Sequence, residues 1–330
     1  REFFDDYVAL LASLFLAIIP AYLHRTMAGF SDKEALGLFF MYLAFFLFIK
    51  SMKEKKDLPA STYALASGFA TGLMGLAWGG FKFSLIIIAA FHLVLFILGK
   101  ISKRAIINYA LWMIPFTVIT SLFIGKYGGL KGLVTSSTSG LVYLVFGILV
   151  FGYLLNNAKR FDAIWARIPL PKEISILLFL LVLGSAATYL FIGQSSVVQL
   201  FSDAKGLLLR GITNSRLGLT VAESKQPFVS DWFNSFGWSF VLFFVGAIML
   251  FFRMVKSLPN QKTLLTMLFT LSIFGMIFSR YASNSSLNGE TQISNLFFFV
   301  PSALFLGYAV FVYFRFYFKD KEAFKNLQNL

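Results

Sequence analysis

The sequence contains no cysteine, and its 330 residues include two histidines. The absence of cysteine excludes disulfides, thiolate metal sites and thiol redox chemistry within this chain. Two histidines are too few for a metal cluster built on imidazole ligands. Charged residues are also scarce, at 13% of the chain, whereas soluble domains carry about 25%.

Apolar residues are correspondingly abundant, at 58% of the chain, and phenylalanine alone occurs 42 times. No soluble core of this length needs so much apolar surface, so the composition indicates that lipid is the solvent. The formal net charge of +14 could indicate a nucleic-acid partner. However, Lys and Arg lie in short clusters between apolar runs and not along one polar face. We therefore expect no nucleic-acid partner.

Long apolar runs predict the fold. A membrane-spanning helix needs about 20 predominantly apolar residues. About ten runs approach this length, at residues 7–23, 35–49, 62–78, 83–99, 105–124, 140–155, 174–192, 237–252, 263–278 and 293–314. They lack the period-two alternation of membrane β-strands. The sequence therefore predicts an all-α, polytopic bundle of about ten transmembrane helices.

Lys and Arg predict the orientation of these helices. Connections 50–56, 100–104, 159–172, 253–262 and 315–325 hold 18 of the 29 basic residues. The alternate connections hold 10, and four of those lie in one long loop, where charge counts for less. Because cytoplasmic loops carry the excess of Lys and Arg, the first set is predicted to be cytoplasmic.

The first acidic segment predicted to face outward is RTMAGFSDKE, which runs from Arg25 to Glu34. Asp32 and Glu34 are two residues apart, so an extended loop would place both carboxylates on one side, where they suit a hard divalent cation. A simpler interpretation stays open: Asp32 caps a helix beginning near Ala35, and Glu34 lies in its first turn. Arg25 beside them is placed to bind a phosphate or to anchor the span at the interface.

The second acidic segment, TVAE at residues 220–223, lies in the long outward loop 193–236. Loops of this length are usually functional or disordered. This loop contains Trp232 and Phe233, so we expect part of it to be ordered against the membrane face. A lone glutamate such as Glu223 is commonly just solvated, and that alternative also stays open.

Together these motifs resemble the catalytic subunit of oligosaccharyltransferase, and its archaeal and bacterial single-subunit forms most of all. RTMAGFSDKE resembles the second acidic motif of that family, and GLMGLAWGG at residues 72–80 resembles its small-residue span ending in Trp-Gly-Gly. TVAE resembles its S/T-V/I-x-E motif on a long external loop. The acidic motifs occur in the family's order, on one predicted membrane side, about 190 residues apart. The resemblance covers nearly the whole of residues 1–330 and implies a GT-C-type membrane domain.

The resemblance implies transfer of a preassembled oligosaccharide from a polyprenyl phosphate or pyrophosphate carrier to Asn in Asn-x-Ser/Thr. The partners would be this lipid-linked donor, an acceptor polypeptide and the bilayer, and the cofactor would be Mn²⁺ or Mg²⁺. The local spacing around Arg280 departs from the family's pattern. The implied site residues are the catalytic Asp32 and Glu223, the metal ligands Asp32, Glu34 and Glu223, and the substrate contacts Arg25, Arg280 and Trp232.

The resemblance also implies two spans and an external loop before residue 1, and a span and an extracytoplasmic domain after residue 330. Residues 1–330 alone would then be inactive. The protein would be a multi-pass protein of the cell membrane with its active site on the extracytoplasmic face. One competing class is another polyprenyl-dependent glycosyltransferase, such as a protein mannosyltransferase, which does not predict TVAE. Another is a lipid flippase or transporter, which predicts ionisable residues within the spans. The predicted spans contain almost none.

Overall fold

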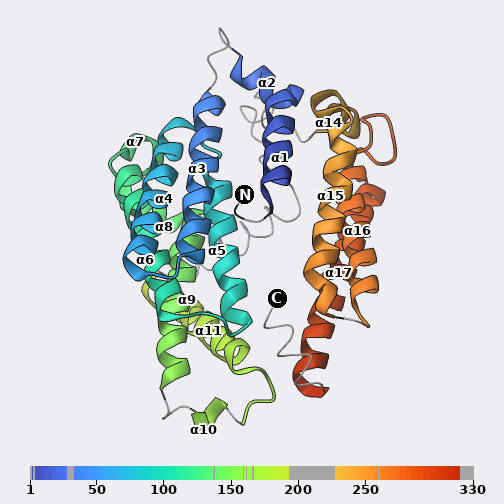
Figure 1. Ribbon diagram of the computed structural model, residues 1–330. Helices are drawn as coiled ribbons and strands as arrows, with labels where there is room; N and C mark the ends of the chain where they lie inside the picture. The colour runs from blue at the N-terminus through green and yellow to red at the C-terminus, as the bar shows by residue number, and fades with distance from the viewer. Residues whose placement is uncertain are drawn as a thin grey trace. The chain divides into compact units, whose positions relative to one another are not determined.

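The computed structural model describes residues 2, 4–27, 33–136, 138–158, 160, 162–165, 167–192, 227–258 and 260–319, and among these residues it is all-helical, with no β-strand (Figure 1). The chain divides into two compact units. Unit 1 comprises Arg1–Ala9 and Arg25–Gly211, and unit 2 comprises Leu10–His24 and Ile212–Leu330. Each unit is described by itself.

The helices follow the apolar runs closely. They are α1 (Asp6–Ile18), α2 (Pro20–Thr26), α3 (Lys33–Lys53), α4 (Asp57–Ala77), α5 (Phe81–Ile97), α6 (Lys103–Ser121), α7 (Ile124–Tyr127), α8 (Gly129–Thr135), α9 (Ser139–Asn157), α10 (Asp162–Trp165), α11 (Lys172–Ile192), α14 (Val229–Phe236), α15 (Ser239–Met254), the 3₁₀ turn η3 (Val255–Ser257), α16 (Lys262–Phe278) and α17 (Gln292–Lys319). Nine of the ten predicted runs coincide with one longer helix each, and the run 7–23 is divided between α1 and α2, so the all-α prediction is confirmed.

Four of the described segments are long and apolar enough to cross a membrane: Lys33–Lys53, Ile124–Asn157, Ser239–Ser257 and Gln292–Lys319. Helices α1, α5 and α16 are shorter but also apolar. Large apolar side chains on these helices remain exposed, for example Phe243 at 67% and Phe83 at 60%. An apolar surface of this kind is stable in lipid, so the chain is an integral membrane protein.

Two local predictions were wrong. The run 7–23 is not one helix, because α1 ends at Ile18 and α2 begins at Pro20. Proline lacks a backbone N–H and disfavours helical geometry in the preceding residue, which explains the break. The connection 125–139, which the sequence predicts as a loop between two spans, contains most of the short helix α7 and all of α8. Gly128 separates them, with a φ of +70°, a left-handed conformation that favours glycine.

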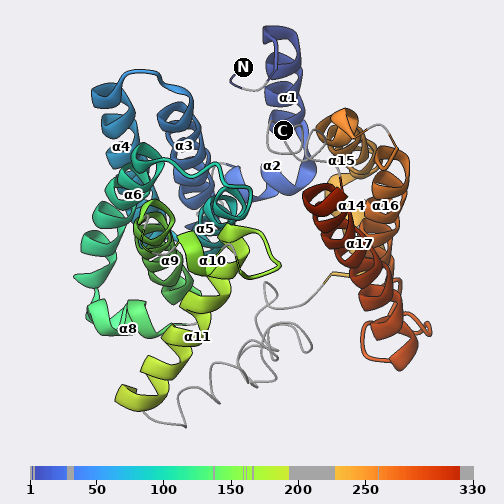
Figure 2. The same ribbon diagram turned by 90° about the horizontal axis from the view of Figure 1, so that it is seen from below.

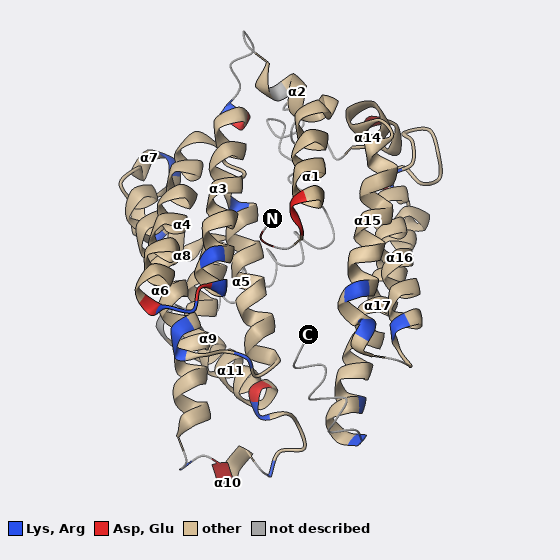
Figure 3. Cartoon of the chain, viewed as in Figure 1, with Lys and Arg blue, Asp and Glu red and all other residues tan. Residues whose placement is uncertain are grey.

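In unit 1, helices α3, α4, α5, α6, α9 and α11 alternate in direction (Figures 1 and 2). Connections 54–56, 98–102 and 158–171 therefore lie at one end of the unit. Connections 78–80 and 122–138 lie at the other end. Figure 3 shows Lys and Arg gathered at the first end. Within unit 1, the basic connections thus share one end, as strict alternation of spans requires.

The basic end of unit 1 is held by Arg104, the second residue of α6. Its guanidinium donates to the carbonyl oxygens of Lys55 and Lys56, at 2.7 and 3.2 Å, and to that of Glu54. It also lies 3.4 Å from the carboxylate of Asp57. The backbone N–H groups of Lys56 and Lys55 donate to the Glu54 carboxylate and hold the pKa of Glu54 below its ordinary value. One arginine therefore fixes the α3–α4 turn to α6.

Small residues on α4 let α6 approach closely. A methyl group at Gly68 would overlap the carbonyl oxygen of Trp112 on α6, and one at Gly72 would lie 2.7 Å from Cδ1 of Ile119. Close approach through small residues is the usual way in which helices pack in lipid. Gly72 of the GLMGLAWGG motif therefore serves helix packing.

Polar side chains in the buried core of unit 1 make hydrogen bonds between helices. The indole N–H of Trp112 donates to Oγ1 of Thr71 at 3.0 Å, and the hydroxyl of Ser67 donates to the carbonyl of Ala44 at 2.7 Å. The hydroxyl of Tyr109 donates to the carbonyl of Val142 at 3.0 Å. These bonds join α4 to α6, α3 to α4 and α6 to α9, and they satisfy groups that would be costly unpaired in lipid.

In unit 2, α16 and α17 lie side by side in both ribbon views (Figures 1 and 2). Pro301 interrupts the hydrogen-bond ladder of α17. A methyl group at Gly275 of α16 would lie 2.5 Å from the carbonyl oxygen of Phe297, which is four residues before Pro301. The hydroxyl of Ser272 donates to that of Ser302 at 3.1 Å. Helix α16 therefore packs closely against α17 at the point where Pro301 removes a backbone hydrogen bond from α17.

Candidate functional site

The first acidic segment lies where α2 ends and α3 begins. Arg25 is the next-to-last residue of α2, and Glu34 is the second residue of α3. The predicted loop 25–35 is therefore helical at both ends. Asp32 and the side chain of Arg25 lie outside the described part of the chain. Glu34 is half-buried in the first turn of α3, where the positive end of the helix dipole favours a carboxylate.

The position of Glu34 confirms one part of the simpler interpretation, since it lies in the first turn of a helix. The helix begins at Lys33, close to Ala35, as that interpretation expects. A capping role of Asp32 stays a prediction.

Trp78 holds the first turns of α3 against the end of α4. A methyl group at Gly37, three residues after Glu34, would lie 2.7 Å from Cβ and 3.2 Å from Cε3 of Trp78. Trp78 follows the last residue of α4 and belongs to the Trp-Gly-Gly motif. Helix α3, which contains the end of the acidic motif, therefore contacts the Trp-Gly-Gly motif at Gly37, a contact that the sequence did not predict.

The connection between α6 and α9 caps the same end of α4 with hydrogen bonds. The ammonium of Lys126 donates to the carbonyl oxygens of Gly75 and Leu76, at 2.9 and 3.3 Å. The hydroxyl of Tyr127 donates to the carbonyl of Gly75 as well. A cation at a helix C-terminus satisfies its last carbonyls and interacts favourably with the dipole. Lys126 is thus a structural cation, which sequence spacing alone did not reveal.

In unit 2, the second half of the predicted site surrounds Arg280, which follows α16. The centre of its guanidinium lies 4.9 Å from the ring centroid of Phe228. Its Nε is buried and has no hydrogen-bond partner among the described residues. The backbone N–H of Val229 donates to the carbonyl of Arg280 at 3.0 Å. Arg280 therefore joins the start of α14 to the end of α16.

Residues 281–291 fold back on Arg280 and do not extend away from it. Asn288 forms an antiparallel bridge with Arg280, and the N–H of Tyr281 donates to the carbonyl of Leu287 at 2.7 Å. Gly289 has a φ of +88°, and a methyl group there would overlap the guanidinium of Arg280. The residues after Arg280, whose spacing departs from the family's pattern, thus form a compact turn that requires glycine at position 289.

Trp232 lies on α14, which confirms that part of the long loop is ordered. The Trp232 ring stacks on Phe236 and Phe240, with centroids 5.6 and 5.9 Å apart. The carboxylate of Asp231 accepts a hydrogen bond from the N–H of Phe228 at 2.8 Å, which caps α14. Trp232 is half-buried, so part of its ring remains accessible.

Glu223 lies outside the described residues. Within the described part of the chain, no group of three or more His, Asp or Glu side chains lies close enough to hold a metal ion. Of the three predicted ligands, the structure describes Glu34 alone. Arg25 and Glu34 belong to unit 1, and Trp232 and Arg280 belong to unit 2.

These features define a polytopic helical membrane protein with a polar segment at the start of α3 and another beside α14. A family model described as "Oligosaccharyl transferase STT3, N-terminal" matches residues 1–204, which is more than half of the chain. The chain therefore belongs to the STT3 family of oligosaccharyl transferases.

Curated relatives agree with this assignment. The chain is similar to subunit STT3B of the rice dolichyl-diphosphooligosaccharide–protein glycosyltransferase, with 27% identity over 197 residues, 58% of this chain and 26% of the rice protein. The Arabidopsis thaliana STT3B subunit is 30% identical over 196 residues, with the same two shares. The Caenorhabditis elegans subunit stt-3 is 29% identical over 160 residues, 48% of this chain and 20% of that protein. The chain thus spans about a quarter of the length of the plant relatives.

Proposed function

We propose that the protein transfers an oligosaccharide en bloc from a polyprenyl phosphate or pyrophosphate carrier to Asn in Asn-x-Ser/Thr. The observation that carries this proposal is the family match over residues 1–204. This stretch includes the whole RTMAGFSDKE motif. The names of the curated relatives, which are subunits of dolichyl-diphosphooligosaccharide–protein glycosyltransferases, support the same reaction class.

The proposal includes the architecture. All ten apolar helices cross the bilayer in a GT-C-type arrangement, and the basic connections face the cytoplasm. The polar segments at the start of α3 and beside α14 then face the extracytoplasmic side of the cell membrane. The alternating directions of the unit 1 helices and their shared basic end support this orientation.

Asp32, Glu34 and Glu223 are proposed as ligands of Mn²⁺ or Mg²⁺. Their carboxylate oxygens are the ligands that hard divalent cations prefer, and Glu34 is the described one, at the start of α3. When bound, the cation supplies electrostatic stabilisation of the charge that develops on the leaving phosphate. Arg25, at the end of α2, binds the carrier phosphate through charge-assisted hydrogen bonds.

Glu223 is proposed to act on the acceptor. An amide nitrogen is a poor nucleophile, and a carboxylate that accepts hydrogen bonds from the amide can twist or polarise it. Because Glu223 comes from a part of the chain remote from Asp32, closure of the long loop assembles the site when substrates bind. The Arg280–Phe228 contact fixes the end of this loop, beside which Trp232 is proposed to contact substrate.

Glycopeptide formation by the full-length protein, with a lipid-linked oligosaccharide and a sequon peptide, tests these roles. Asp32→Asn and Glu223→Gln are each expected to reduce turnover at least about a hundredfold, roughly 3 kcal/mol of transition-state stabilisation. Asp57→Asn, at an exposed acid at the basic end of unit 1, provides a charge-matched control with near-normal turnover. Chelation of divalent cations should abolish transfer, and Mn²⁺ or Mg²⁺ should restore it. Near-normal transfer by both site variants would refute the proposal.

A further inference from the structure

An apolar cavity of about 470 Å³ lies at the basic end of unit 1, among α9, α10 and α11. Leu155 of α9 and Ile164 of α10 line two sides of it, and Ile168 and Leu170 line the segment that leads into α11. A volume of this size is within the range of pockets that hold small organic ligands. Such pockets are lined mostly by apolar side chains, with few polar groups. None of these residues belongs to the acidic site.

The long wall of the cavity is one stripe of α11. Ser175, Leu178, Phe179 and Val182 line it, at the spacing i, i+3, i+4 and i+7 that shares a helix face. The stripe is roughly 10 Å long, from a rise of about 1.5 Å per residue. Leu178, Phe179 and Val182 are 48, 47 and 69% exposed, so the cavity opens sideways along this helix. On a membrane helix, a sideways opening faces acyl chains.

Two buried polar side chains lie at the end of this stripe nearest the α9–α11 connection. Trp165 and Ser175 are 7 and 4% exposed, and both line the cavity. Neither Nε1 of Trp165 nor Oγ of Ser175 has a hydrogen-bond partner within the described part of the chain. Both groups can donate a hydrogen bond, and a buried donor without an acceptor is costly. A ligand that brings acceptor oxygens to this depth, such as ester carbonyls, would satisfy them.

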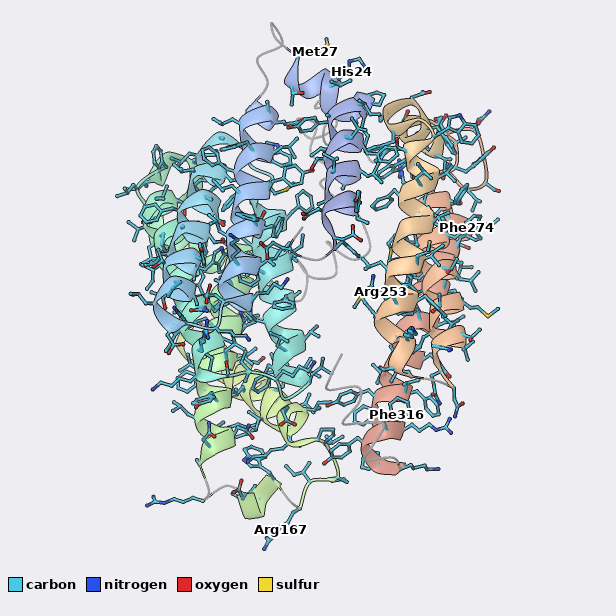
Figure 4. All side chains as sticks on the ribbon, viewed as in Figure 1. His24, Met27, Arg167, Arg253, Phe274 and Phe316 are labelled. Atoms are coloured by element: carbon cyan, nitrogen blue, oxygen red, sulfur yellow. The ribbon has the colours of Figure 1, made fainter. Side chains whose placement is uncertain are left out.

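The connection around the cavity is basic. The segment 156–173 contains four Lys or Arg and two acidic residues, for a net charge of +2. Lys172 is engaged, since its ammonium lies 2.7 Å from both the carbonyl of Asn156 and the carboxylate of Asp162. Arg160 and Arg167 are exposed, and Arg167 points away from the helices (Figure 4). Exposed arginines beside an apolar cavity suit a phosphate at the membrane surface.

We propose that this cavity binds an anionic glycerophospholipid of the surrounding leaflet. One acyl chain lies along the α11 stripe, and the ester oxygens reach the level of Trp165 and Ser175. The phosphate lies between Arg160 and Arg167. The site depends on α11 crossing the bilayer and not on the transferase reaction.

Quenching of Trp165 fluorescence by brominated lipids tests this site in the full-length protein reconstituted into phosphatidylcholine vesicles. The vesicles are titrated with brominated phosphatidylglycerol or with brominated phosphatidylcholine of the same acyl chains. The contribution of Trp165 is the difference between the wild-type protein and Trp165→Phe. We expect half-maximal quenching at a mole fraction of the anionic lipid at least about fivefold lower than that of the zwitterionic lipid. Equal titration curves in the wild-type protein would overturn the proposal without need of any further variant.

Charge-matched variants separate local binding from general attraction to an anionic surface. Arg160→Gln combined with Arg167→Gln should make the two curves coincide. Lys100→Gln combined with Lys103→Gln removes equal charge from the same end of unit 1 and should preserve the fivefold preference. An equal loss of preference in both double variants would assign it to the surface potential and refute the site. Absence of Trp165 quenching by either lipid would show that another occupant, such as a partner side chain, fills the cavity, and would also refute it.

Discussion

Replacement of Gly37 by alanine should change the stability of the protein through two effects of opposite sign, a gain in helix propensity and a steric overlap. In a helix interior, alanine is more favourable than glycine by about 1 kcal/mol. The added methyl would lie 2.7 Å from Cβ of Trp78, whereas carbon atoms separate by about 3.5–4.0 Å at optimal contact. Because Cβ is fixed to the backbone, rotation of the indole cannot relieve this overlap, and α3 and α4 must separate. Overpacking of this kind costs about 1–3 kcal/mol.

The net expectation for Gly37→Ala is a loss of about 0–2 kcal/mol. Gly147→Ala is the matched control, since Gly147 lies within α9 of the same unit and a methyl group there meets nothing within 4 Å. This control should gain up to about 1 kcal/mol, so the difference between the variants isolates the steric cost of about 1–3 kcal/mol. The apparent melting temperatures, read from gel-filtration recovery after heating, should differ by roughly 2–10 °C.

Activity adds a second readout for Gly37→Ala. Separation of α3 from Trp78 would move Glu34, three residues away, so turnover should fall by more than the loss of folded protein explains. Gly147→Ala should leave turnover per folded molecule unchanged. Equal melting temperatures for the two variants would refute the close contact of Gly37 with Trp78.

Three further predictions follow from single contacts. Arg104→Ala should lower stability by about 1–3 kcal/mol in thermal unfolding, because three carbonyls lose a charged donor, and Arg104→Lys should restore part of it. A double-mutant cycle of Phe228→Leu and Arg280→Gln should give a coupling of about 0.5–2 kcal/mol, and additive effects would contradict the cation–π contact. Trp112→Phe should cost about 0.6–2 kcal/mol by loss of the bond to Thr71, and the cost should shrink in a Thr71→Val background if that bond is its cause.

The sequence predicted the helices because each one is specified locally. Length and apolarity determine where a helix lies in lipid, and even the break that the predicted run 7–23 overlooked is explained by one residue, Pro20. The short helices α7 and α8 were missed for a related reason. Their sequence, from Ile124 to Thr135, is rich in glycine and far too short to cross a membrane. Both its composition and its length therefore favour a loop.

The contacts of the site residues were harder to predict from the sequence, because they join segments that lie far apart in the chain. Arg280 meets Phe228, 52 positions earlier, after residues 281–291 turn back through Gly289. Gly37 meets Trp78 across the whole of α3 and α4. Motif spacing could identify which residue types belong to the site, but not that Trp78 packs against Gly37, three residues after Glu34. If the Asp32 motif needs that support, then Gly37→Ala must impair transfer while Asp32 and Glu34 are intact, which a purely local function of the motif does not predict.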